Sequence, residues 1–594
     1  MMSGLNRYFQ SRTCRFFTIA AHLRKTIFGA MKRPYRLPCL VVNIIQATII
    51  LFLAASANAQ SQDVPDYVLV NGKIFTAEAT HTYTQALAIK GERILAVGTS
   101  EEISRLASPH TIRIDLHGRL VIPGINDAHY HFLPRPVAYH LLLKGQEPTW
   151  DEVKKEIASA VVTTPPGTLI NGVIGFAMFD EPDANRATLD KLSPDHPVQL
   201  ACYWGHCSIF NSLFMRKVGI DDREPDPPGG IYPREADGRI VGRSIEYANF
   251  RLHGKLQELT PKELQLQDAK RMLSEAARFG VTTIQVMAIG SRDETAAIMR
   301  KADSPIRIRV MDFSLSAPDH PLPPPGVQDS LNVYIGGLKW VLDGEPILRT
   351  AALRQHYMDG LKDTGHLNFS ESQMEVILRE SLRQKQQLLV HVVGDHTIEQ
   401  FFKAMMATGG PAVWSQRRVR LEHAEGLLPD LVQQAKELGV IVVQNPTAFT
   451  LGDLFLTRYG KDRAAINQPF GSLLKAGIPL ALGSDGQTST PNLPTDDAFR
   501  DSEINPYLSI MLATHDPFRP DESITREQAV TAYTLSSAYA EFAEKDKGSL
   551  EPGKLADLAV LSQNIFETSS TDLPKTESLL TMVGGKIVHN RLTK

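Results

Sequence analysis

Residues 121–132 read VIPGINDAHYHF, an apolar run that leads into Asp127, His129 and His131. Such a run is typical of a buried β-strand, and in an extended segment side chains two positions apart point the same way. His129 and His131 can therefore bind one metal ion from the end of a strand. On its own a His-x-His pair is weak evidence for a metal site. The evidence becomes stronger if other residues of metal-binding type also lie at the ends of predicted strands.

Three more residues of metal-binding type follow predicted strands. His391 follows residues 388–390, His423 follows residues 419–422, and Asp485 follows residues 481–484. Imidazole and carboxylate ligands suit zinc, and a (β/α)8 barrel gathers its strand ends at one catalytic face. A buried structural role is the usual alternative for any single histidine. It does not explain why four histidines and one aspartate all lie at strand ends.

The middle of the chain alternates predicted helices and strands. Residues 260–286, 370–392, 431–443 and 472–482 each contain a helical pattern and then an apolar strand, and in three of them a glycine separates the two. The first two helices begin with capping sequences at Thr260 and Ser370. Apolar strands that alternate with helices indicate a parallel sheet buried on both faces. We therefore predict an α/β fold, a (β/α)8 TIM-type barrel over residues 125–546.

Both ends of the chain predict short strands instead. Residues 67–70 lead into Asn71-Gly72, a hairpin signal, and further strands are expected at 86–89, 93–97, 556–561, 581–583 and 586–588. Strand-rich ends around a long middle predict one small β-sandwich domain made from both termini, residues 66–124 and 547–594.

Residues 133–255 interrupt the barrel pattern. They are rich in proline and glycine, as at 165–167 and 227–230. We interpret them as an insertion after the first barrel strand. Loops at that face of a barrel carry function, so the insertion is expected to shape the substrate pocket.

The composition is that of a globular enzyme. The chain has 594 residues, of which 43% are hydrophobic and 22% charged. Eight of its 63 Lys and Arg but none of its 66 Asp and Glu lie in the first 59 residues, so the remainder carries a net charge of −11. A mildly acidic body argues against a nucleic-acid partner, which would require a basic face.

Residues 1–59 predict a secretory signal peptide. Basic residues at 32 and 33 precede an apolar run over 40–55, and Ala57-Asn58-Ala59 forms a cleavage site before Gln60. Met31 is then a candidate true start. We expect a periplasmic or secreted protein with no stable membrane association after cleavage. An uncleaved membrane anchor is the alternative.

Cysteine use leaves one question open. Cys14 and Cys39 lie in the leader, so only Cys202 and Cys207 remain in the mature chain. A disulfide, which an oxidising compartment permits, and a pair of buried thiols are equally compatible with the sequence.

Taken together, these segments resemble the metal-dependent amidohydrolase superfamily. Residues 121–132 resemble its signature, Pro-Gly-hydrophobic-x-Asp-x-His-x-His. More narrowly, residues 67–594 resemble the amidohydrolase 3 family, the group that contains N-substituted formamide deformylase-like proteins. The segments that carry this resemblance are residues 203–211 (YWGHCSIFN), 242–246 (GRSIE), 337–344 (GLKWVLDG), 391–395 (HVVGD), 420–423 (RLEH), 483–485 (GSD) and 551–558 (EPGKLADL).

The resemblance implies two divalent metal ions. Zinc is the expected identity, and manganese, iron or nickel would also fit the ligand set. One ion would be held by His129, His131 and Asp485, and the second by His391 and His423. Lys339 would be carboxylated by CO2, and its carbamate would bridge both ions. A surface lysine is the alternative reading of Lys339, although its apolar neighbours disfavour it.

The resemblance also implies roles in catalysis and substrate binding. Asp485 would take the proton from the attacking water, and His206 would donate to the substrate carbonyl. Asn211, Glu246 and Asp343 would lie near the substrate, and for each of these three and for His206 a structural hydrogen bond is an equal alternative.

The implied chemistry is hydrolysis. Metal binding lowers the pKa of a water molecule toward about 7, which makes hydroxide available at neutral pH. We expect cleavage of a non-peptide C–N bond in an amide, formamide or cyclic amide of a small molecule. One rival is an esterase, lactonase or dipeptidase on the same centre, and another is an exported, non-catalytic binding or regulatory protein. All six ligand positions are filled, which favours the enzyme. A homo-oligomer remains open.

Overall fold

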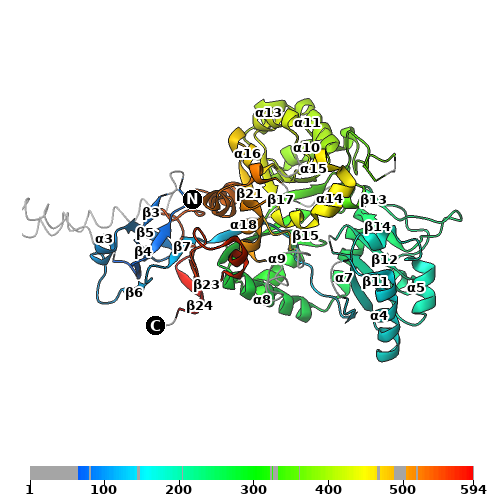
Figure 1. The fold of residues 1–594 in the computed structure, drawn as a ribbon, viewed down its shortest axis with the longest axis horizontal. Coiled ribbons are helices and arrows are strands. Elements are labelled where there is room, and N and C mark those ends of the chain that lie inside the picture. The colour runs from blue at the N-terminus through cyan, green and yellow to red at the C-terminus, as the bar shows by residue number, and fades with distance from the viewer. Residues whose placement is uncertain are drawn as a thin grey trace, which may run out of the picture. The chain divides into compact units, whose positions relative to one another are not determined.

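The protein is described from a computed structural model (Figure 1). It describes residues 64–592 apart from 79–81, 144–146, 204, 321–323, 325–331, 360–361, 465–468, 487–503 and 517–518. The predicted leader, its cleavage site and Met31 therefore lie outside the described residues. Within the described part of the chain, no helix combines the length and apolar character needed to cross a membrane.

Eight parallel strands form the central sheet, which confirms the predicted barrel. Their order follows the chain, as expected when each strand is joined to the next by a right-handed crossover. The strands are β8 (Ile125–Tyr130), β15 (Val281–Ile289), β16 (Arg307–Phe313), β17 (Val333–Val341), β18 (Leu388–Val392), β19 (Arg420–His423), β20 (Ile441–Gln444) and β21 (Leu480–Leu482). All nine residues of β15 are buried and six of them are apolar, as expected for a strand covered on both faces.

Helices cover the outside of the barrel (Figure 1). Those between the strands are α8 (Lys262–Arg278), α9 (Arg292–Lys301), α10 (Glu371–Gln384), α11 (Asp395–Ala407), α12 (Gly410–Trp414), α13 (Pro429–Leu438), α14 (Gly452–Tyr459), α15 (Lys461–Ala464) and α16 (Phe470–Ala476). After β21 the chain forms α18 (Pro506–Thr514), α19 (Arg526–Thr531) and α20 (Ser537–Tyr539). Helices α13 and α16 end at Gly439 and Gly477, both in the left-handed region, as the predicted glycine stops require.

One of the two predicted capping boxes is present. Ser370 and Gln373 cap α10 reciprocally. The box predicted at Thr260 is wrong, because α8 begins after Pro261 with no side-chain cap. Thr260 instead ends the preceding helix, where its hydroxyl donates to the carbonyl of Leu256 at 2.9 Å.

The first and last strands close the barrel beside the metal-binding motif. The amide of Asp485 donates to the carbonyl of His129 at 2.7 Å, and the amide and hydroxyl of Ser484 both donate to Asp127. A Cβ on Gly483 would lie 2.6 Å from the backbone nitrogen of His129. A glycine is therefore needed where β21 meets β8, and this close approach brings Asp485 next to the histidines.

A small β-sandwich is made from both ends of the chain. One sheet has the order β5-β4-β1-β6 and the other β24-β23-β22-β7-β2-β3. Their inner faces share one apolar core, to which Leu69, Leu87, Val121, Leu558 and Met582 contribute. The strands are β1 (Tyr67–Val70), β2 (Lys73–Phe75), β3 (Tyr83–Thr84), β4 (Ala86–Lys90), β5 (Arg93–Gly98), β6 (Ile112–Asp115), β7 (Leu120–Pro123), β22 (Leu558–Leu561), β23 (Ser578–Val583) and β24 (Lys586–Asn590), with α3 (Ser100–Ser104) after β5.

The hairpin predicted at Asn71-Gly72 is wrong. Strand β1 pairs with β4 and β6, whereas β2 pairs with β3 and β7 in the other sheet. The turn therefore passes the chain from one sheet to the other. Asn71 adopts a φ of 58°, so the left-handed turn preference is present but serves a sheet crossing.

The predicted insertion forms a layer of its own between β8 and β15. Its sheet has the order β13-β14-β12-β11-β10-β9. The strands are β9 (Tyr139–His140), β10 (Ile170–Ile174), β11 (Val198–Cys202), β12 (Cys207–Phe210), β13 (Gly230–Ile231) and β14 (Arg243–Glu246), and the helices are α4 (Trp150–Thr163), α5 (Arg186–Leu192), α6 (Ser212–Lys217) and α7 (Tyr247–Leu259). A disulfide joins Cys202 at the end of β11 to Cys207 at the start of β12, with 5.4 Å between their Cα atoms. It resolves the open question about these two cysteines.

Candidate metal centre

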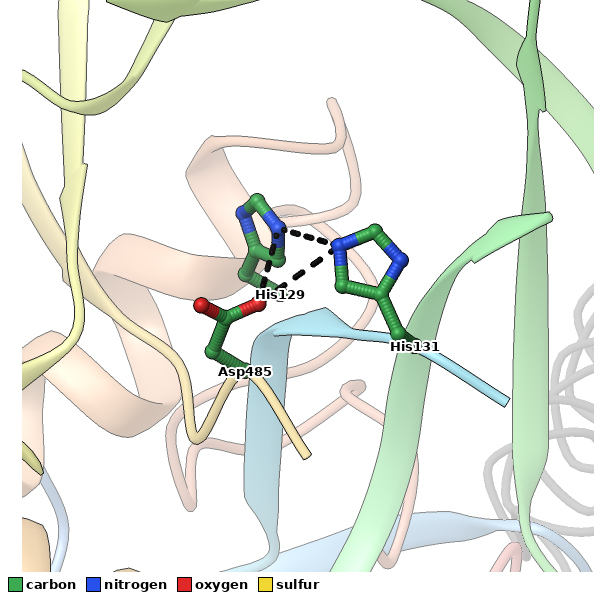
Figure 2. Close-up of side chains that lie close together, drawn as sticks. All are labelled: His129, His131 and Asp485. Atoms are coloured by element: carbon green, nitrogen blue, oxygen red, sulfur yellow. Dashed lines mark hydrogen bonds and ion pairs between the residues drawn. The ribbon is translucent and has the colours of Figure 1, made fainter. Parts of the chain in front are cut away.

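Three side chains of the types that bind metal ions meet where β8 and β21 end (Figure 2). His129 Nε2 lies 3.3 Å from His131 Nε2 and 3.3 Å from Asp485 Oδ1, and His131 Nε2 lies 3.5 Å from the same oxygen. His129 ends up beside His131 because the two alternate along one strand, while Asp485 comes from the strand that closes the barrel. The arrangement predicted from the HYH motif and Asp485 is therefore present in space.

A buried carboxylate orients His129. Glu422 Oε2 lies 2.6 Å from His129 Nδ1, and both side chains are fully buried. Arg420, also fully buried, holds Glu422 with its Nε at 2.8 Å from Oε1. Because the carboxylate accepts the Nδ1 proton, the lone pair of His129 Nε2 is left to face Asp485 and His131. This imidazole–carboxylate pairing is the usual support of a metal-binding histidine.

Burial keeps the imidazoles in the form that binds metal. It lowers the pKa of His131 to about 3, with the nearby Lys339 as the next cause. It also lowers the pKa values of His129, His391 and His423 well below their usual range. Neutral imidazole is the ligand form, so these side chains need no deprotonation at neutral pH.

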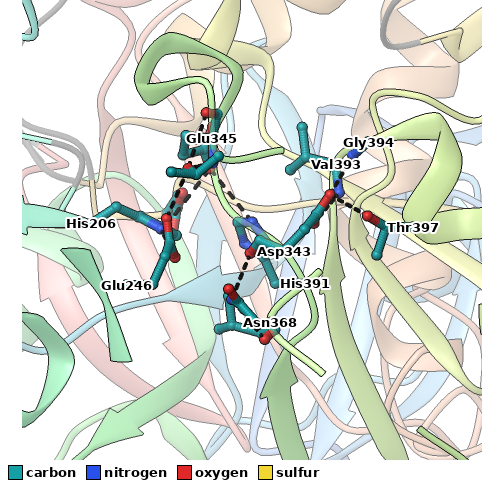
Figure 3. Close-up of polar contacts among 12 residues, drawn as sticks. His206, Glu246, Asp343, Glu345, Asn368, His391, Val393, Gly394 and Thr397 are labelled. Carbon is teal, nitrogen blue, oxygen red and sulfur yellow. Dashed lines mark hydrogen bonds and ion pairs between the residues drawn. The ribbon is translucent and has the colours of Figure 1, made fainter. Parts of the chain in front are cut away.

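A second group lies beside the first. His391 and His423 come from the ends of β18 and β19, and their ring centroids are 4.5 Å apart. Glu345, in the turn after β17, lies 3.7 Å from His391 Nε2 and 3.8 Å from His206 Nε2 (Figure 3). The ring of His423 is also 5.0 Å from that of His129, so the two groups are continuous.

Lys339 lies between the two groups and is not a surface lysine. It is 1% exposed, and its Nζ atom is buried with no hydrogen-bond partner. Burial lowers its pKa to about 8, although Glu422 and Asp485 oppose this shift. An amine with such a pKa is partly neutral near pH 7, unlike an ordinary lysine.

His206 reaches the site from the insertion. It lies in the loop between β11 and β12, which the Cys202–Cys207 disulfide closes. Its Nδ1 lies 2.8 Å from Glu246, whose other oxygen accepts the hydroxyl of Thr350 at 3.0 Å (Figure 3). Glu246, predicted as a substrate contact, therefore acts on the site by holding His206.

Asp343 makes its hydrogen bonds to backbone amides and to one hydroxyl of the fold. Asp343 is fully buried and accepts hydrogen bonds from the amides of Val393, Gly394 and Ala352 and from the hydroxyl of Thr397 (Figure 3). It fixes the turn that follows His391, and it is not among the described residues that line the central cavity. Burial raises the pKa of Asp343 to about 7, against the opposing effect of these donors.

Asn211 is part of the scaffold of the insertion. Its side-chain oxygen accepts from the amides of Val198 and Phe214, and its amide donates to the carbonyl of His196 at 2.8 Å. It caps α6 and is not among the described residues that line the central cavity. This differs from the predicted substrate contact, because both ends of the side chain are used within the fold.

These groups surround a cavity of about 190 Å3. Its described polar lining includes His131, His206, Lys339, Glu345, His391, His423 and Asp485. Leu133, Phe250, Ile289, Phe313 and Val341 are its apolar lining residues. The cavity therefore combines reactive polar groups with apolar surface suited to part of a small molecule.

Sequence reasoning missed two carboxylates, Glu345 and Glu422. Glu422 lies within the quoted segment RLEH, and Glu345 follows the segment GLKWVLDG by one residue. Both glutamates lie in or next to segments that contain predicted ligands. Nothing in their sequence positions distinguishes either one from an ordinary solvent-exposed glutamate.

The donor set fits divalent metal ions. The unpartnered, buried Nζ of Lys339 and Nε2 of His391 both lie within the cluster. Among the described residues, the ligand atoms of His129, His131 and Asp485, and those of His206, Glu345 and His391, lie within 4.8 Å of one another in each set. Lone pairs of imidazole nitrogens and carboxylate oxygens that face one another at this range favour a cation between them, and imidazole with carboxylate suits zinc-type ions.

Comparison with known proteins agrees with this geometry. A sequence profile described as "Amidohydrolase family" matches residues 113–589. Protein LONG AFTER FAR-RED 3 of Arabidopsis thaliana is 27% identical over 565 residues, which cover 88% of this chain and 91% of that protein. N-substituted formamide deformylase of Arthrobacter pascens is 26% identical and covers 89% of this chain and 98% of its own.

A solved structure shares the fold. An uncharacterized metal-dependent hydrolase from Pyrococcus horikoshii OT3 matches with a TM-score of 0.64 at 19% identity, over 85% of this chain and 99% of that one. At this identity the likeness concerns the architecture alone.

Proposed function

Because the chain belongs to the amidohydrolase family, and is thus a metal-dependent hydrolase acting on C–N bonds, we propose that it cleaves a non-peptide amide, formamide or cyclic amide of a small molecule. The observation that carries this proposal is the convergence of four histidines, Lys339 and Asp485 on one cavity at the carboxyl ends of the barrel strands. That face is where barrels of this kind carry their catalytic groups.

Two zinc ions are the proposed cofactor. His129, His131 and Asp485 would hold one ion, and His391 and His423 the other, with Glu345 as an additional carboxylate beside His391. The metals would polarise the scissile carbonyl and lower the pKa of a water molecule.

Lys339 is proposed to carry a carbamate that bridges the two ions. As an ammonium it would repel them, whereas carboxylation converts it to an anionic ligand. Its burial, its unpartnered nitrogen and its lowered pKa support this role, because only the neutral amine reacts with CO2.

Asp485 and His206 are the proposed proton-handling residues. Asp485 takes the proton of the attacking water on its carboxylate and passes it to the leaving nitrogen. His206 is proposed to donate to the carbonyl oxygen of the substrate, and the contact of its Nδ1 with Glu246 holds its Nε2 on the side of Glu345 and the cavity. The ring of Phe250 packs against the ring of His206, and these less polar surroundings would strengthen the hydrogen bond.

Metal content and turnover test the proposal. Protein purified without chelator should contain one to two zinc-type ions per chain by plasma mass spectrometry, and it should hydrolyse members of a panel of N-formyl and N-acyl amines. Lys339→Ala should lose metal and activity, and short carboxylic acids should partly restore both. A protein that neither contains nor takes up metal would instead support a non-catalytic binding function on this scaffold.

We also propose that the mature chain is exported. The basic and apolar pattern of residues 1–59 and the Cys202–Cys207 disulfide support this, since disulfides persist in oxidising compartments. Expression of the full chain in a bacterial host should yield protein outside the cytoplasm that begins at Gln60 by N-terminal sequencing. Retention in the membrane with an intact leader would contradict export.

A further inference from the structure

The interior of the barrel beneath the metal-centre cavity is built in layers, because side chains two positions apart on a strand share a face. On β15, β16 and β18 the residues that line the cavity are Ile289, Phe313 and His391. Two positions earlier lies a buried apolar cluster of Met287, Met311 and Leu389. Two positions earlier again lies a buried polar layer of Gln285, Arg309 and Gln387. An apolar layer therefore separates the cavity from a polar one.

Gln285 is the junction of the polar layer. Its Oε1 accepts hydrogen bonds from Nη1 of Arg420 at 2.6 Å and from Nη1 of Arg309 at 3.3 Å. Its Nε2 donates to Oδ1 of Asn126 and to the carbonyl of Ser537, both at 3.2 Å. A guanidinium group can only donate and a carbonyl can only accept, so these partners fix the orientation of the amide.

Arg420 extends this junction to the metal centre. Its Nε and Nη2 donate to the two oxygens of Glu422 at 2.8 and 3.0 Å, and Nη2 also donates to the carbonyl of Ala128 at 2.7 Å. Glu422 in turn lies 2.6 Å from Nδ1 of His129. All three guanidinium nitrogens are thus used, and Gln285 holds the one that Glu422 and Ala128 do not.

The other end of the network is a second buried carboxylate. Asn126 donates to Glu541 at 2.7 Å, and Glu541 also accepts the hydroxyl of Tyr334 at 2.6 Å and pairs with Lys547 at 2.7 Å. The network therefore runs between two carboxylates and crosses the apolar layer along β19, from Arg420 to Glu422.

The composition of this network favours a positioning role over a stabilising one. Barrel interiors are usually filled by apolar side chains, and buried ion pairs are often no more stabilising than apolar residues of similar volume. The cluster that contains Met287 shows ordinary apolar packing one layer away. A fully satisfied polar network, by contrast, holds its members in one arrangement. The member of this network that contacts a proposed metal ligand is Glu422.

We propose that Gln285 is a positioning residue of the metal centre, which fixes Arg420 and through it the Glu422 carboxylate that orients His129. The inference rests on the proposed role of His129 as a metal ligand. Gln285 itself is not among the described residues that line the cavity. Loss of its oxygen leaves Nη1 of Arg420 without its acceptor, so the guanidinium group is free to turn and Glu422 is held less firmly.

Zinc affinity tests this role on the full chain. Gln285→Met keeps the volume of the side chain and removes the acceptor, and it should weaken zinc binding roughly three- to tenfold. Competition with a chromophoric chelator measures this loss. Met287→Leu is the matched control, because it changes the next inward-facing residue of β15, one layer nearer the cavity, and it should bind zinc as the wild type does. An equal loss in the control would overturn the proposal.

A double-mutant cycle tests the route through Glu422. If Gln285 acts through that carboxylate, Gln285→Met should weaken zinc binding by less than about twofold in a Glu422→Gln background. Losses that multiply would overturn the proposal, because they would show independent effects. Gln285→Asn serves if the methionine variant does not fold. It keeps an amide in the polar layer and withdraws the oxygen from Arg420 by one methylene, so it should show a loss of zinc affinity that is likewise absent in the Glu422→Gln background.

A signal from metal-free protein separates this inference from the proposed function. A ring N–H bonded to a buried carboxylate gives a proton resonance far downfield of the amides, and its displacement in Glu422→Gln identifies that of His129. Gln285→Met or Gln285→Asn should shift this resonance, and Met287→Leu should not. A shift in a protein that takes up no zinc would uphold the positioning of His129 and reject the metal centre. Zinc binding with no shift and unchanged affinity in the Gln285 variants would overturn the positioning role and leave the hydrolase intact.

Discussion

His129 shows how a single contact decides whether a histidine can act as a ligand. Its Nδ1–H donates a hydrogen bond to Glu422 at 2.6 Å, and Arg420 donates a hydrogen bond to the same carboxylate. The lone pair of Nε2 is thereby aimed at Asp485 and His131. A residue that contacts no substrate thus controls the geometry of the centre.

Glu422→Gln should therefore weaken metal binding while leaving all proposed ligands in place. We expect the affinity for zinc to fall about 10- to 100-fold, as for other carboxylates that support metal-binding histidines. Competition with a chromophoric chelator measures this, and Glu437→Gln, on the exposed face of α13, serves as the control. Unchanged affinity in Glu422→Gln would mean that the barrel alone orients His129.

The pKa of Lys339 predicts the pH dependence of activation. Burial lowers that pKa to about 8, so below this pH the ammonium dominates and the reactive neutral amine becomes scarcer. At a fixed concentration of dissolved CO2, the CO2-dependent uptake of zinc by metal-free protein should therefore speed up about tenfold per pH unit up to about pH 8, and then level off. Lys339→Gln should take up metal slowly at every pH, with no response to CO2, and a wild-type rate that is flat between pH 6 and 8 at fixed dissolved CO2 would refute the carbamate.

Among the secondary-structure elements, the loop between β11 and β12 is the most consequential for the site. The Cys202–Cys207 disulfide closes it, and it carries His206 toward the cavity that the barrel strands form. A loop this short contributes only about 2 kcal/mol of stability through chain entropy. The main effect of the disulfide is therefore to restrict where His206 can lie.

Replacing both cysteines by serine should separate catalysis from metal binding. We expect kcat to fall about 10- to 100-fold, because a displacement of His206 of about 1 Å is enough for such a loss. Metal content should not change, since His129, His131, His391 and His423 come from the barrel. An unaltered kcat would show that Glu246 and the strands alone hold His206.

At the scale of the whole molecule, the β-sandwich is joined to the barrel by a buried ion pair. Arg307, at the start of β16, donates to both oxygens of Asp557 at 2.8 and 3.0 Å, and both side chains are about 5% exposed. The backbone carbonyl of Asp557 also accepts the amide of Gly124, just before β8. The C-terminal segment thus supports the strand that carries the metal-binding motif.

Asp557→Ala should destabilise the whole protein. Removing one partner leaves the other as an unpaired buried charge, which costs about 3–5 kcal/mol of unfolding free energy. Urea unfolding measures this, and Glu567→Ala, which breaks the exposed Lys73–Glu567 pair of the same sandwich, should cause no measurable change. Equal effects of the two substitutions would contradict the joining role of the buried pair.

The sequence by itself determined the features that local patterns encode. The alternation of helix and strand predicted the parallel barrel, and the helix stops at Gly439 and Gly477 lie where expected. The His-x-His spacing and the strand-end positions of His391, His423 and Asp485 predicted that these side chains lie close together, and they do. Such features follow from strand and helix periodicity, which act within a few residues along the chain.

Tertiary structure alone decided the contacts between distant residues. His129 and Glu422 are 293 positions apart, and no spacing in the sequence joins them. The resemblance placed Asn211 near the substrate, and the local pattern predicted a helix cap at Thr260. In the structure both side chains instead bond to backbone groups within the fold. Asn71-Gly72 supplies a left-handed turn, yet the packing of two sheets decides which strands it joins. Local sequence sets the conformations available to a segment, and burial of the shared core selects among them.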